Sequence, residues 1–307
     1  MHFLIVGAGA MGCLFAARLN LAGNEVSLLE KIPEWADKIN TQGIRVEGVT
    51  GEYSAAVPAL AERPGVSPEA VLFCVKSNNT KEAGEAVKAW LKPETLVVTL
   101  QNGVGNIETL EDIFGKDQVF GGVTAEGATV LDPGHIRHAG QGETLIGPKG
   151  EPGGPVENLV TALNKAGFKT RSIENVQDLV WGKLIINVGI NALTALTGLK
   201  NGRLPQFEGT RAVMEEAVRE AVAVAAAKKI ELPYPDPVGR VMEVCDATAG
   251  NIASMLQDVL NRKITEIDYI NGAIVREGKR LGLPTPINFA LTSLVRVIQE
   301  TYEERLQ

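Results

Sequence analysis

The chain has 307 residues, with 30 Lys or Arg against 37 Asp or Glu, and therefore a net charge of −7. This acidic balance argues against broad binding of nucleic acids or acidic membranes, which are themselves negatively charged. The cysteines are odd in number and lack a CxxC pair, and the histidines are too few and too poorly spaced for a His-based metal site. We therefore expect no metal and a reducing cytoplasmic setting. We also expect no membrane span, because no basic leader precedes "HFLIV" and no apolar run reaches about 18 residues.

The first half of the chain alternates short β-branched runs with helical patterns. The strand-like runs are "FLIVG", "EVSLLE", "AVLFCVK", "TLVVTLQNG" and "QVFGGVTA". Such alternation predicts a parallel sheet with crossover helices. A glycine- and proline-rich stretch, "GPKGEPGGP", follows, in which "GEPGG" predicts a surface loop. One more helix, "VENLVTALNKAGF", and a short "KTRSIE" complete the predicted first domain, residues 1–174.

After Glu174 the apolar residues recur with a period of about 3.6, which is typical of helices. The pattern predicts helices over 176–198, 208–229, 238–246, 250–257, 263–282 and 287–305. Prolines in "ELPYPDP" and "GLPTPIN" end helices, because proline lacks the amide hydrogen and clashes with the preceding turn. We therefore expect an all-helical second domain, residues 175–307.

The stretch "FLIVGAGAMGCLFAARL" places Gly7, Gly9 and Gly12 in GxGxxG spacing between a predicted strand and a predicted helix. The first glycine permits a tight turn, the second lets the backbone approach a pyrophosphate, and the third lets helix and strand pack closely. The amide groups of the helix N-terminus favour an anion at the same place. The context predicts a dinucleotide-binding turn.

Residues at the ends of three further strands are expected to face the cofactor. Glu30 stands where a carboxylate would accept hydrogen bonds from an adenosine ribose, whereas Lys31 could pair with a 2′-phosphate, so the two point to NAD and NADP respectively. Both could also be solvated surface charges. Lys76 and Asn102 follow strands whose carboxyl ends should share the same edge, although Asn102 could equally be a turn residue before glycine.

A polar stripe interrupts the apolar helix "KLIINVGINALTALTG". Lys183, Asn187 and Asn191 are each four residues apart and so lie on one helix face. A buried lysine requires a partner, and a nearby carboxylate would keep it charged and able to donate a proton. Ser254 and Glu266, on later predicted helical segments, are the candidates to line the same cleft. The alternative is that Lys183 reaches solvent and the other two are ordinary surface residues.

Taken together, the chain resembles the ketopantoate reductase family (2-dehydropantoate 2-reductase) nearly from end to end. The resemblance rests on "VGAGAMG", "VKSNNT", "TLQNGVGN", "GATVLDPGHIRHAGQGETLIG", "WGKLIINVGINALTALTG" and "SMLQDVLNRKITEIDYINGAIVREGKRLGLPTPIN", of which the last two are the most specific. It implies an α/β fold: an N-terminal Rossmann-like dinucleotide-binding domain followed by an all-α domain similar to the C-terminal domain of 6-phosphogluconate dehydrogenase. It also implies NADPH-dependent reduction of ketopantoate to (R)-pantoate, in the route to pantothenate and coenzyme A.

The resemblance also implies a role for each candidate residue. Lys183 falls on the lysine that polarises the C2 carbonyl and donates a proton to it, and Glu266 on the carboxylate that orients the site. The implied substrate-binding residues are Asn102, Asn187, Asn191, Asn201 and Ser254. The implied cofactor-binding residues are Gly7, Ala8, Gly9, Ala10, Met11, Gly12, Lys31, Lys76, Asn102 and Ala125.

One departure from the family leaves the cofactor open. Many members carry an arginine or similar cation without an adjacent acid at the end of the second strand, whereas this chain has Glu30 and Lys31. We favour NADP(H), with Lys31 on the 2′-phosphate, and keep NAD(H) because of Glu30.

The sequence leaves two other functional hypotheses open. One is a related 2-keto or 3-hydroxy acid dehydrogenase of the 6-phosphogluconate dehydrogenase-like superfamily, and the other is a non-catalytic nucleotide-binding sensor. The expected partner is a small keto acid. A homodimer is the other expected partner, since an apolar helix face serves either a core or an interface.

Overall fold

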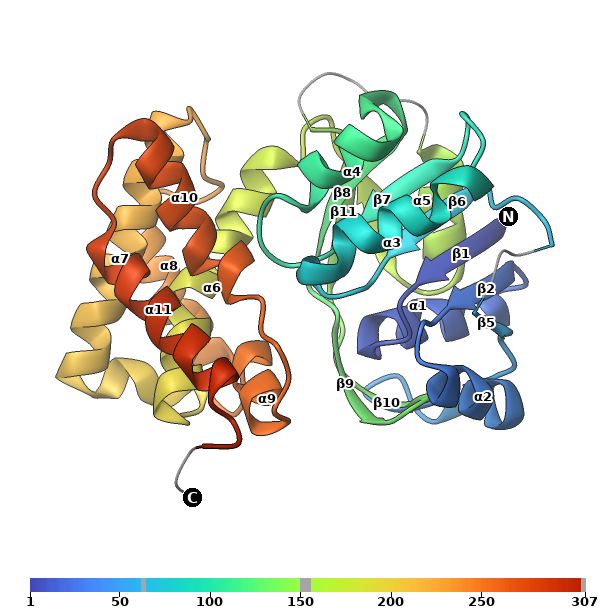
Figure 1. The fold of residues 1–307 in the computed structure, drawn as a ribbon, viewed down its shortest axis with the longest axis horizontal. Coiled ribbons are helices and arrows are strands. Elements are labelled where there is room, and N and C mark those ends of the chain that lie inside the picture. The colour runs from blue at the N-terminus through green and yellow to red at the C-terminus, as the bar shows by residue number, and fades with distance from the viewer. Residues whose placement is uncertain (62–64, 150–155, 305–307) are drawn as a thin grey trace. The chain divides into compact units, whose positions relative to one another are not determined.

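A computed structural model of the protein describes residues 1–61, 65–149 and 156–304 (Figure 1). The chain forms two compact units. The first comprises Met1–Gln101 and Asn106–Val176, and the second comprises Asn102–Gly105 and Gln177–Gln307. The predicted "GEPGG" surface loop, residues 150–154, lies outside the described residues.

An eight-stranded sheet forms the centre of the first unit, in the order β12-β11-β8-β7-β6-β1-β2-β5. All neighbouring strands are parallel except β8 and β11, so the predicted parallel sheet is confirmed across β8-β7-β6-β1-β2-β5. The strands are β1 (His2–Val6), β2 (Glu25–Leu29), β5 (Ala59–Leu60), β6 (Ala70–Phe73), β7 (Leu96–Thr99), β8 (Val119–Thr124), β11 (Glu143–Gly147) and β12 (Lys169–Ser172). Central strands β1 and β6 are buried along their whole length, as expected for a sheet covered on both faces.

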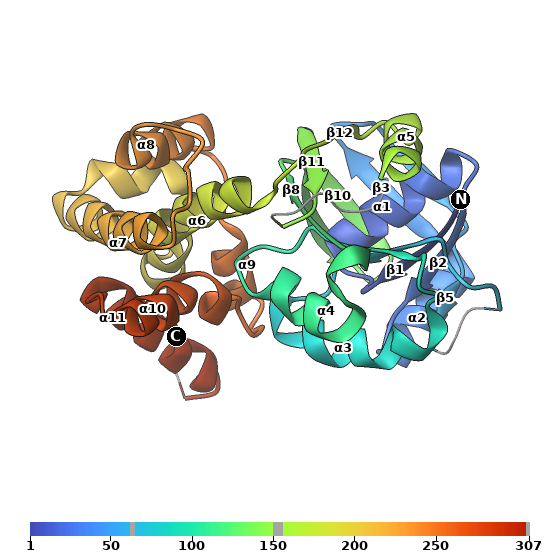
Figure 2. The same cartoon turned by 90° about the horizontal axis from the view of Figure 1, so that it is seen from above.

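Helices cover both faces of this sheet, with α3 and α4 on one side and α1 and α5 on the other (Figure 2). The helices of the first unit are α1 (Ala10–Leu21), α2 (Pro33–Gln42), α3 (Thr80–Val87), α4 (Asn106–Phe114) and α5 (Glu157–Lys165). Three short 3₁₀ segments, η1 (Ser77–Asn79), η2 (Lys88–Trp90) and η3 (Lys116–Gln118), extend the loops. The carboxyl ends of the parallel strands therefore meet helix N-termini at one edge, where ligands bind in folds of this kind.

A second, four-stranded sheet packs against α1, in the order β4-β3-β10-β9. Its strands are β3 (Ile44–Gly48), β4 (Tyr53–Ala55), β9 (Gly127–Asp132) and β10 (His135–Gly140). The sequence pattern did not predict it, because these strands are only partly buried: β9 has no fully buried residue.

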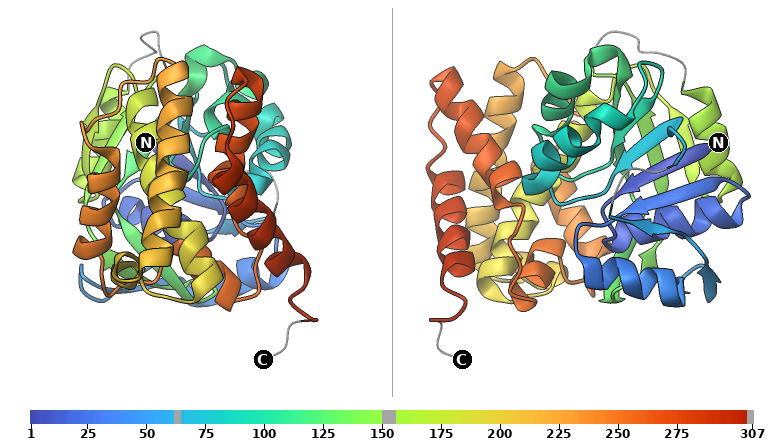
Figure 3. Two further views of the ribbon diagram at one scale, coloured as in Figure 1. Left: turned by 90° about the vertical axis from the view of Figure 1, so that its left-hand side faces the viewer. Right: turned by 45° about the vertical axis from the view of Figure 1, so that its right-hand side comes forward.

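The second unit is helical, as predicted. Its elements are α6 (Gln177–Thr197), η4 (Asn201–Gln206), α7 (Glu208–Ala227), α8 (Pro237–Ala247), α9 (Ser254–Leu260), η5 (Ile267–Tyr269), α10 (Asn271–Leu281) and α11 (Pro286–Glu300). Figure 3 shows α10 and α11, in orange and red, packed side by side. The predicted helix over 263–282 is wrong in its first part, since Ile270, with φ −110° and ψ −97°, precedes the start of α10. The helix predicted over 250–257 begins only at Ser254. The helix predicted over 287–305 is wrong at its end, since α11 ends at Glu300 and residues 301–304 are not helical.

Helix α6 forms the centre of the second unit. Leu184, Ile185 and Val188 are at most 1% exposed. Among the described residues, α6 is also the one helix long and apolar enough to cross a membrane, contrary to the expectation that no such run exists. Its most apolar window is 67% buried, which is the behaviour of a core helix.

Candidate active site

The glycine turn between β1 and α1 has the geometry of a phosphate cradle. Gly7 has φ +104°, and a Cβ there would lie 2.9 Å from the backbone nitrogen of Val75. A Cβ on Gly12 would lie 1.9 Å from the carbonyl oxygen of Gly7, so strand and helix approach too closely for any side chain. A Cβ on Gly9 would come no closer than 4.0 Å to another atom, and no side chain caps the α1 N-terminus. Free amide groups beside an open glycine surface fit a dinucleotide pyrophosphate.

The two neighbouring charges at the end of β2 have different surroundings. Glu30 is 8% exposed, and its carboxylate accepts hydrogen bonds from the backbone amides of Ala8 at 3.0 Å and Ile32 at 2.9 Å. The Lys31 side chain is 63% exposed and lies 3.6 Å from the carboxylate of Glu82 on α3, which is itself exposed. Glu30 is therefore a structural part of the turn, whereas the pair that Lys31 forms with Glu82 is screened by solvent.

Two thiols lie beneath the turn. Burial raises the pKa of Cys13 to about 12 and that of Cys74 to about 12. The sulfhydryl of Cys13 also donates to the carbonyl of Ala8. At neutral pH neither cysteine is a thiolate, so both serve as packing residues rather than nucleophiles.

Asn102 lies on a loop that belongs to the helical unit. The amide of Val104 donates to the carbonyl oxygen of Tyr269 at 3.0 Å. Gly103 has φ +84°, and a Cβ there would lie 2.4 Å from that same oxygen, so this contact requires a glycine at position 103. Tyr269 in turn donates its amide to the carbonyl of Glu266. The asparagine predicted at the strand end is thus on a loop attached to the segment that carries the predicted carboxylate.

Lys183 and Glu266 are electrostatically coupled within the helical unit. Burial lowers the pKa of Lys183 to about 8, and the Glu266 carboxylate opposes this shift. Glu266 is 6% exposed, at the N-terminal boundary of η5 rather than on the predicted long helix. Asn187 is half-buried and Asn191 is buried, one and two turns farther along α6 on the face of Lys183. An ammonium with a pKa near neutrality, beside two carboxamides, can stabilise an oxyanion and donate a proton.

Of the predicted substrate-binding residues, Asn201 is buried and hydrogen-bonded within the helical unit, whereas Ser254 is exposed. The Asn201 amide nitrogen donates to the hydroxyl of Thr248 at 2.9 Å, and its Oδ1 is buried without a partner among the described residues. Asn201 therefore anchors η4 to the end of α8. Ser254 is exposed, as the first residue of α9. Lys76 is half-buried and directly precedes η1.

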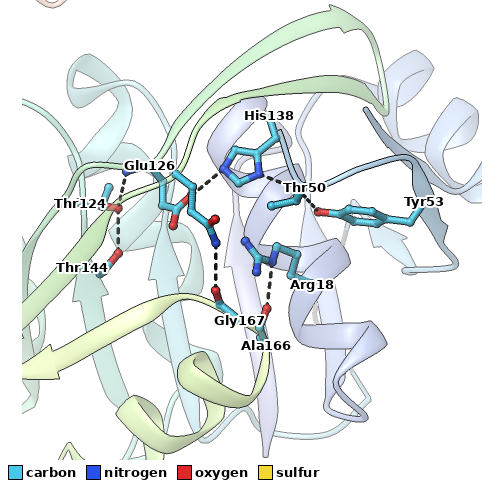
Figure 4. Close-up of polar contacts among 10 residues, drawn as sticks. Arg18, Thr50, Tyr53, Thr124, Glu126, His138, Thr144, Ala166 and Gly167 are labelled. Carbon is cyan, nitrogen blue, oxygen red and sulfur yellow. Dashed lines mark hydrogen bonds and ion pairs between the residues drawn. The ribbon is translucent and has the colours of Figure 1, made fainter. Parts of the chain in front are cut away.

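Ala125 is exposed just beyond the end of β8, with its amide donating to the carbonyl of Glu143. The next residue begins a buried polar chain (Figure 4). The Glu126 carboxylate lies 2.6 Å from Nε2 of His138, both side chains are fully buried, and Nδ1 of His138 lies 2.8 Å from the hydroxyl of Thr50. Sequence reasoning missed this pair, which joins the β8–β9 connection to β10.

The sequence patterns of known families match both units. The family described as "Ketopantoate reductase PanE/ApbA" matches residues 3–151, and "Ketopantoate reductase PanE/ApbA C terminal" matches residues 175–299. The chain belongs to the ketopantoate reductase family. The 2-dehydropantoate 2-reductase of Pyrococcus horikoshii is 34% identical over 298 residues, which cover 96% of this chain and 97% of that protein. The protein of the same name from Halobacterium salinarum is 34% identical over 302 residues, covering 97% and 99%. Family members with this name are oxidoreductases.

Solved structures agree with this membership. A PanE/ApbA family ketopantoate reductase from Ralstonia eutropha superposes with a TM-score of 0.90 at 36% identity, and the match covers 99% of this chain and 100% of that chain. A D-mandelate dehydrogenase in a ternary structure with NADH and anilino(oxo)acetate has a TM-score of 0.92 at 28% identity, with coverage of 99% and 100%. The ketopantoate reductase fold is thus shared with an enzyme whose structure contains NADH.

Proposed function

We propose that this ketopantoate reductase reduces 2-dehydropantoate to (R)-pantoate with NADPH, in the route to pantothenate and coenzyme A. The observation that carries the proposal is the coupling of Lys183 to the buried Glu266 in the helical unit, which keeps a proton-donating ammonium in low-dielectric surroundings. The full-length similarity to proteins named 2-dehydropantoate 2-reductase supports the choice of substrate.

The reaction divides into hydride transfer and proton transfer. The glycine turn of Gly7, Gly9 and Gly12 would hold the pyrophosphate of a nicotinamide cofactor, which when bound would supply the hydride for C2 of the keto acid. Negative charge then develops on the ketone oxygen, where the Lys183 ammonium stabilises it and donates the proton. Glu266 favours the charged form of Lys183 and so keeps the proton available at neutral pH.

The carboxamides have a binding role in this proposal. Asn187 and Asn191 follow Lys183 on one face of α6 and offer both donors and acceptors, which suits a substrate with a carboxylate and a hydroxyl. Asn102 lies on the loop that the Val104–Tyr269 hydrogen bond holds to η5, the segment that follows Glu266. We assign these three side chains to substrate orientation, with Asn102 also near the cofactor.

NADPH is favoured over NADH because of how the end of β2 is organised. Both carboxylate oxygens of Glu30 already accept backbone hydrogen bonds, so this acid need not indicate an NAD ribose site. Lys31 is exposed beside it and offers a cation for a 2′-phosphate.

A second candidate is reduction of another 2-keto acid with NADH. The similarity to the D-mandelate dehydrogenase that contains NADH and anilino(oxo)acetate favours it. The deciding experiment is a matrix of initial rates with 2-dehydropantoate, phenylglyoxylate and pyruvate, each with NADPH and with NADH. The proposal expects the highest kcat/KM for 2-dehydropantoate with NADPH. A higher value for phenylglyoxylate would replace the proposed substrate, and a higher value with NADH would replace the proposed cofactor.

A further inference from the structure

A buried chain of five polar side chains joins two loops at the carboxyl edge of the main sheet. Its members, called the Thr80 network below, are Thr99, Gln101, Thr80, Asn106 and Ser77. Thr99, Thr80, Asn106 and Ser77 are at most 3% exposed, and Gln101 is half-buried. None of them was among the residues expected from the sequence to bind substrate or cofactor.

Four side-chain hydrogen bonds of the Thr80 network run in one direction, from Thr99 to Ser77. The Thr99 hydroxyl donates to Oε1 of Gln101 at 2.8 Å, and Nε2 of Gln101 donates to the Thr80 hydroxyl at 2.8 Å. The Thr80 hydroxyl donates to Oδ1 of Asn106 at 2.9 Å, and Nδ2 of Asn106 donates to the Ser77 hydroxyl at 3.0 Å. Each donor in such a chain polarises the next, and a missing member leaves buried groups unpaired.

Thr80 has the central position in this chain. Its single hydroxyl accepts from Gln101 and donates to Asn106, the residues that directly precede and follow the loop Asn102–Gly105. Thr80 and Asn106 are also the first residues of α3 and α4, which pack closely at Gly84. One oxygen atom thus fixes both ends of the loop that carries Asn102.

The same network reaches the other loops at this edge. Nε2 of Gln101 also donates to the carbonyl oxygen of Val75 at 2.7 Å, and Val75 directly precedes Lys76. The backbone of Val75 lies against Gly7, where a Cβ would come within 2.9 Å of its nitrogen. Gln101 therefore links the loops of Asn102 and Lys76 to the glycine turn.

We propose that Thr80 and Gln101 are positioning residues of the reductase, which hold both ends of the loop Asn102–Gly105 and keep the loop of Lys76 against the glycine turn, without touching substrate. The assignment rests on the proposed function for what these loops hold. A loop tied at both ends to one buried hydroxyl keeps its asparagine in a single place, and misplacement by about 1 Å costs on the order of 100-fold in rate.

The chain offers a matched control for the test. Thr95 is another buried threonine, 1% exposed, whose hydroxyl donates to the carbonyl of Pro68 and accepts from the amide of Lys92. It precedes the first residue of β7, at the end of the strand opposite to Thr99. Thr95→Val therefore removes two hydrogen bonds of similar kind at the other edge of the sheet.

The experiment compares Thr80→Val, Thr80→Ser and Thr95→Val by kinetics and by hydrogen–deuterium exchange. We expect Thr80→Val to lower kcat/KM by about 10- to 100-fold, Thr80→Ser to restore most of it, and Thr95→Val to lose stability with kinetics close to wild type. Exchange should quicken at the amides of residues 102–105 in Thr80→Val alone. Equal stability losses with wild-type kinetics and unchanged loop exchange in Thr80→Val would overturn the proposal.

Two further comparisons keep the result interpretable. If Thr80→Val does not fold, Thr99→Val takes its place, because it removes the first hydrogen bond of the network. Faster exchange at the amides of residues 102–105 is then expected in Thr99→Val. Unchanged exchange at these amides would refute the assignment. Exchange is measured on the protein without substrate, so it tests whether Thr80 and Gln101 hold the loop independently of activity. A wild-type protein that is inactive towards 2-dehydropantoate would refute the proposed function alone.

Discussion

The carboxylate of Glu30 accepts a hydrogen bond from the backbone amide of Ala8 in the glycine turn, at 3.0 Å. Its second oxygen accepts from the amide of Ile32 at 2.9 Å, so the acid closes the end of β2 onto the turn. A carboxylate at this place in the chain is usually interpreted as a ribose ligand. Here it has a structural task that is independent of the adenosine phosphate.

Glu30→Ala is therefore expected to weaken binding of NADPH and NADH by similar factors. The change leaves the amides of Ala8, in the turn, and of Ile32, before α2, without their acceptor and should also cost about 1–3 kcal/mol of unfolding free energy. Isothermal titration with each cofactor measures the first effect and urea unfolding the second. Glu25→Ala, at the exposed first position of the same strand, is the control and should change neither. A loss confined to NADH would instead make Glu30 a ribose ligand.

Lys31→Ala is expected to raise KM for NADPH strongly and KM for NADH little, because only NADPH carries the 2′-phosphate. The neighbouring acid provides the complementary test. Glu82 lies 3.6 Å from the Lys31 ammonium, and Glu82→Gln should free this cation and remove a nearby negative charge. We expect KM for NADPH to fall by up to about fivefold in Glu82→Gln, given the weakness of exposed pairs. Equal effects of Lys31→Ala on both cofactors would remove this lysine from the phosphate.

The parallel sheet and the helical unit could be predicted because their apolar residues recur regularly along the chain, as β-branched runs in the first unit and with a helical period in the second. The small sheet β4-β3-β10-β9 could not, since its strands are only partly buried and their burial comes from packing against α1. The break before α10 was equally hidden: the residues from Thr265 to Ile270 are apolar and polar in a helical rhythm, but Ile270 adopts a non-helical conformation. Local pattern does not encode such a break when tertiary contacts, here the Tyr269 carbonyl bound by Val104, select it.

The candidate site divides in the same way. The spacing of Lys183, Asn187 and Asn191 fixed their common face, because helix geometry alone determines it. The partners of Glu30 and the Thr80 network could not be predicted from the sequence, since hydrogen bonds between distant loops leave no periodic signal. A threonine after "KSNN" and a glutamine before "NG" were the available signs, and either is ordinary in a loop.

The pKa of Lys183 predicts the pH dependence of the reaction. Burial lowers this pKa to about 8, so the ammonium is protonated at neutral pH and loses its proton as pH rises through about 8. The value of kcat/KM should therefore be level below this pH and fall above it. Because Glu266 raises the pKa of Lys183, Glu266→Gln should move the alkaline limb to lower pH. Glu243→Gln, on the exposed side of α8, should leave the profile unchanged. An alkaline limb that does not move in Glu266→Gln would contradict the coupling.

The same residue should limit the stability of the helical unit. The folded-state pKa of Lys183 is lowered from its ordinary value of 10.5 to about 8, so the unfolded chain binds more protons between these two values and unfolding free energy rises with pH in that window. Below about pH 8 the protein carries the desolvation cost of a half-buried ammonium, which Glu266 offsets in part. Lys183→Met should therefore be inactive yet more stable at pH 7, by about 1–2 kcal/mol, with the gain shrinking above pH 8. Urea unfolding at pH 7 and pH 10 measures this; a variant less stable than wild type at pH 7 would show that the ammonium is well compensated.

The Glu126–His138 pair is expected to contribute far more to stability than its counterpart on the same strand. Glu126→Ala leaves a fully buried imidazole without its partner, and breaking a buried pair from one side costs about 3–5 kcal/mol. His135, also on β10, lies 3.1 Å from Glu47 but is partly exposed, and His135→Ala should cost at most about 1 kcal/mol. The double variant Glu126→Leu/His138→Leu should recover most of the loss, because neither charge nor donor is then buried alone. Urea unfolding of the three variants provides the comparison. Equal losses in Glu126→Ala and His135→Ala would mean that the β8–β9 connection is held to β10 by packing alone.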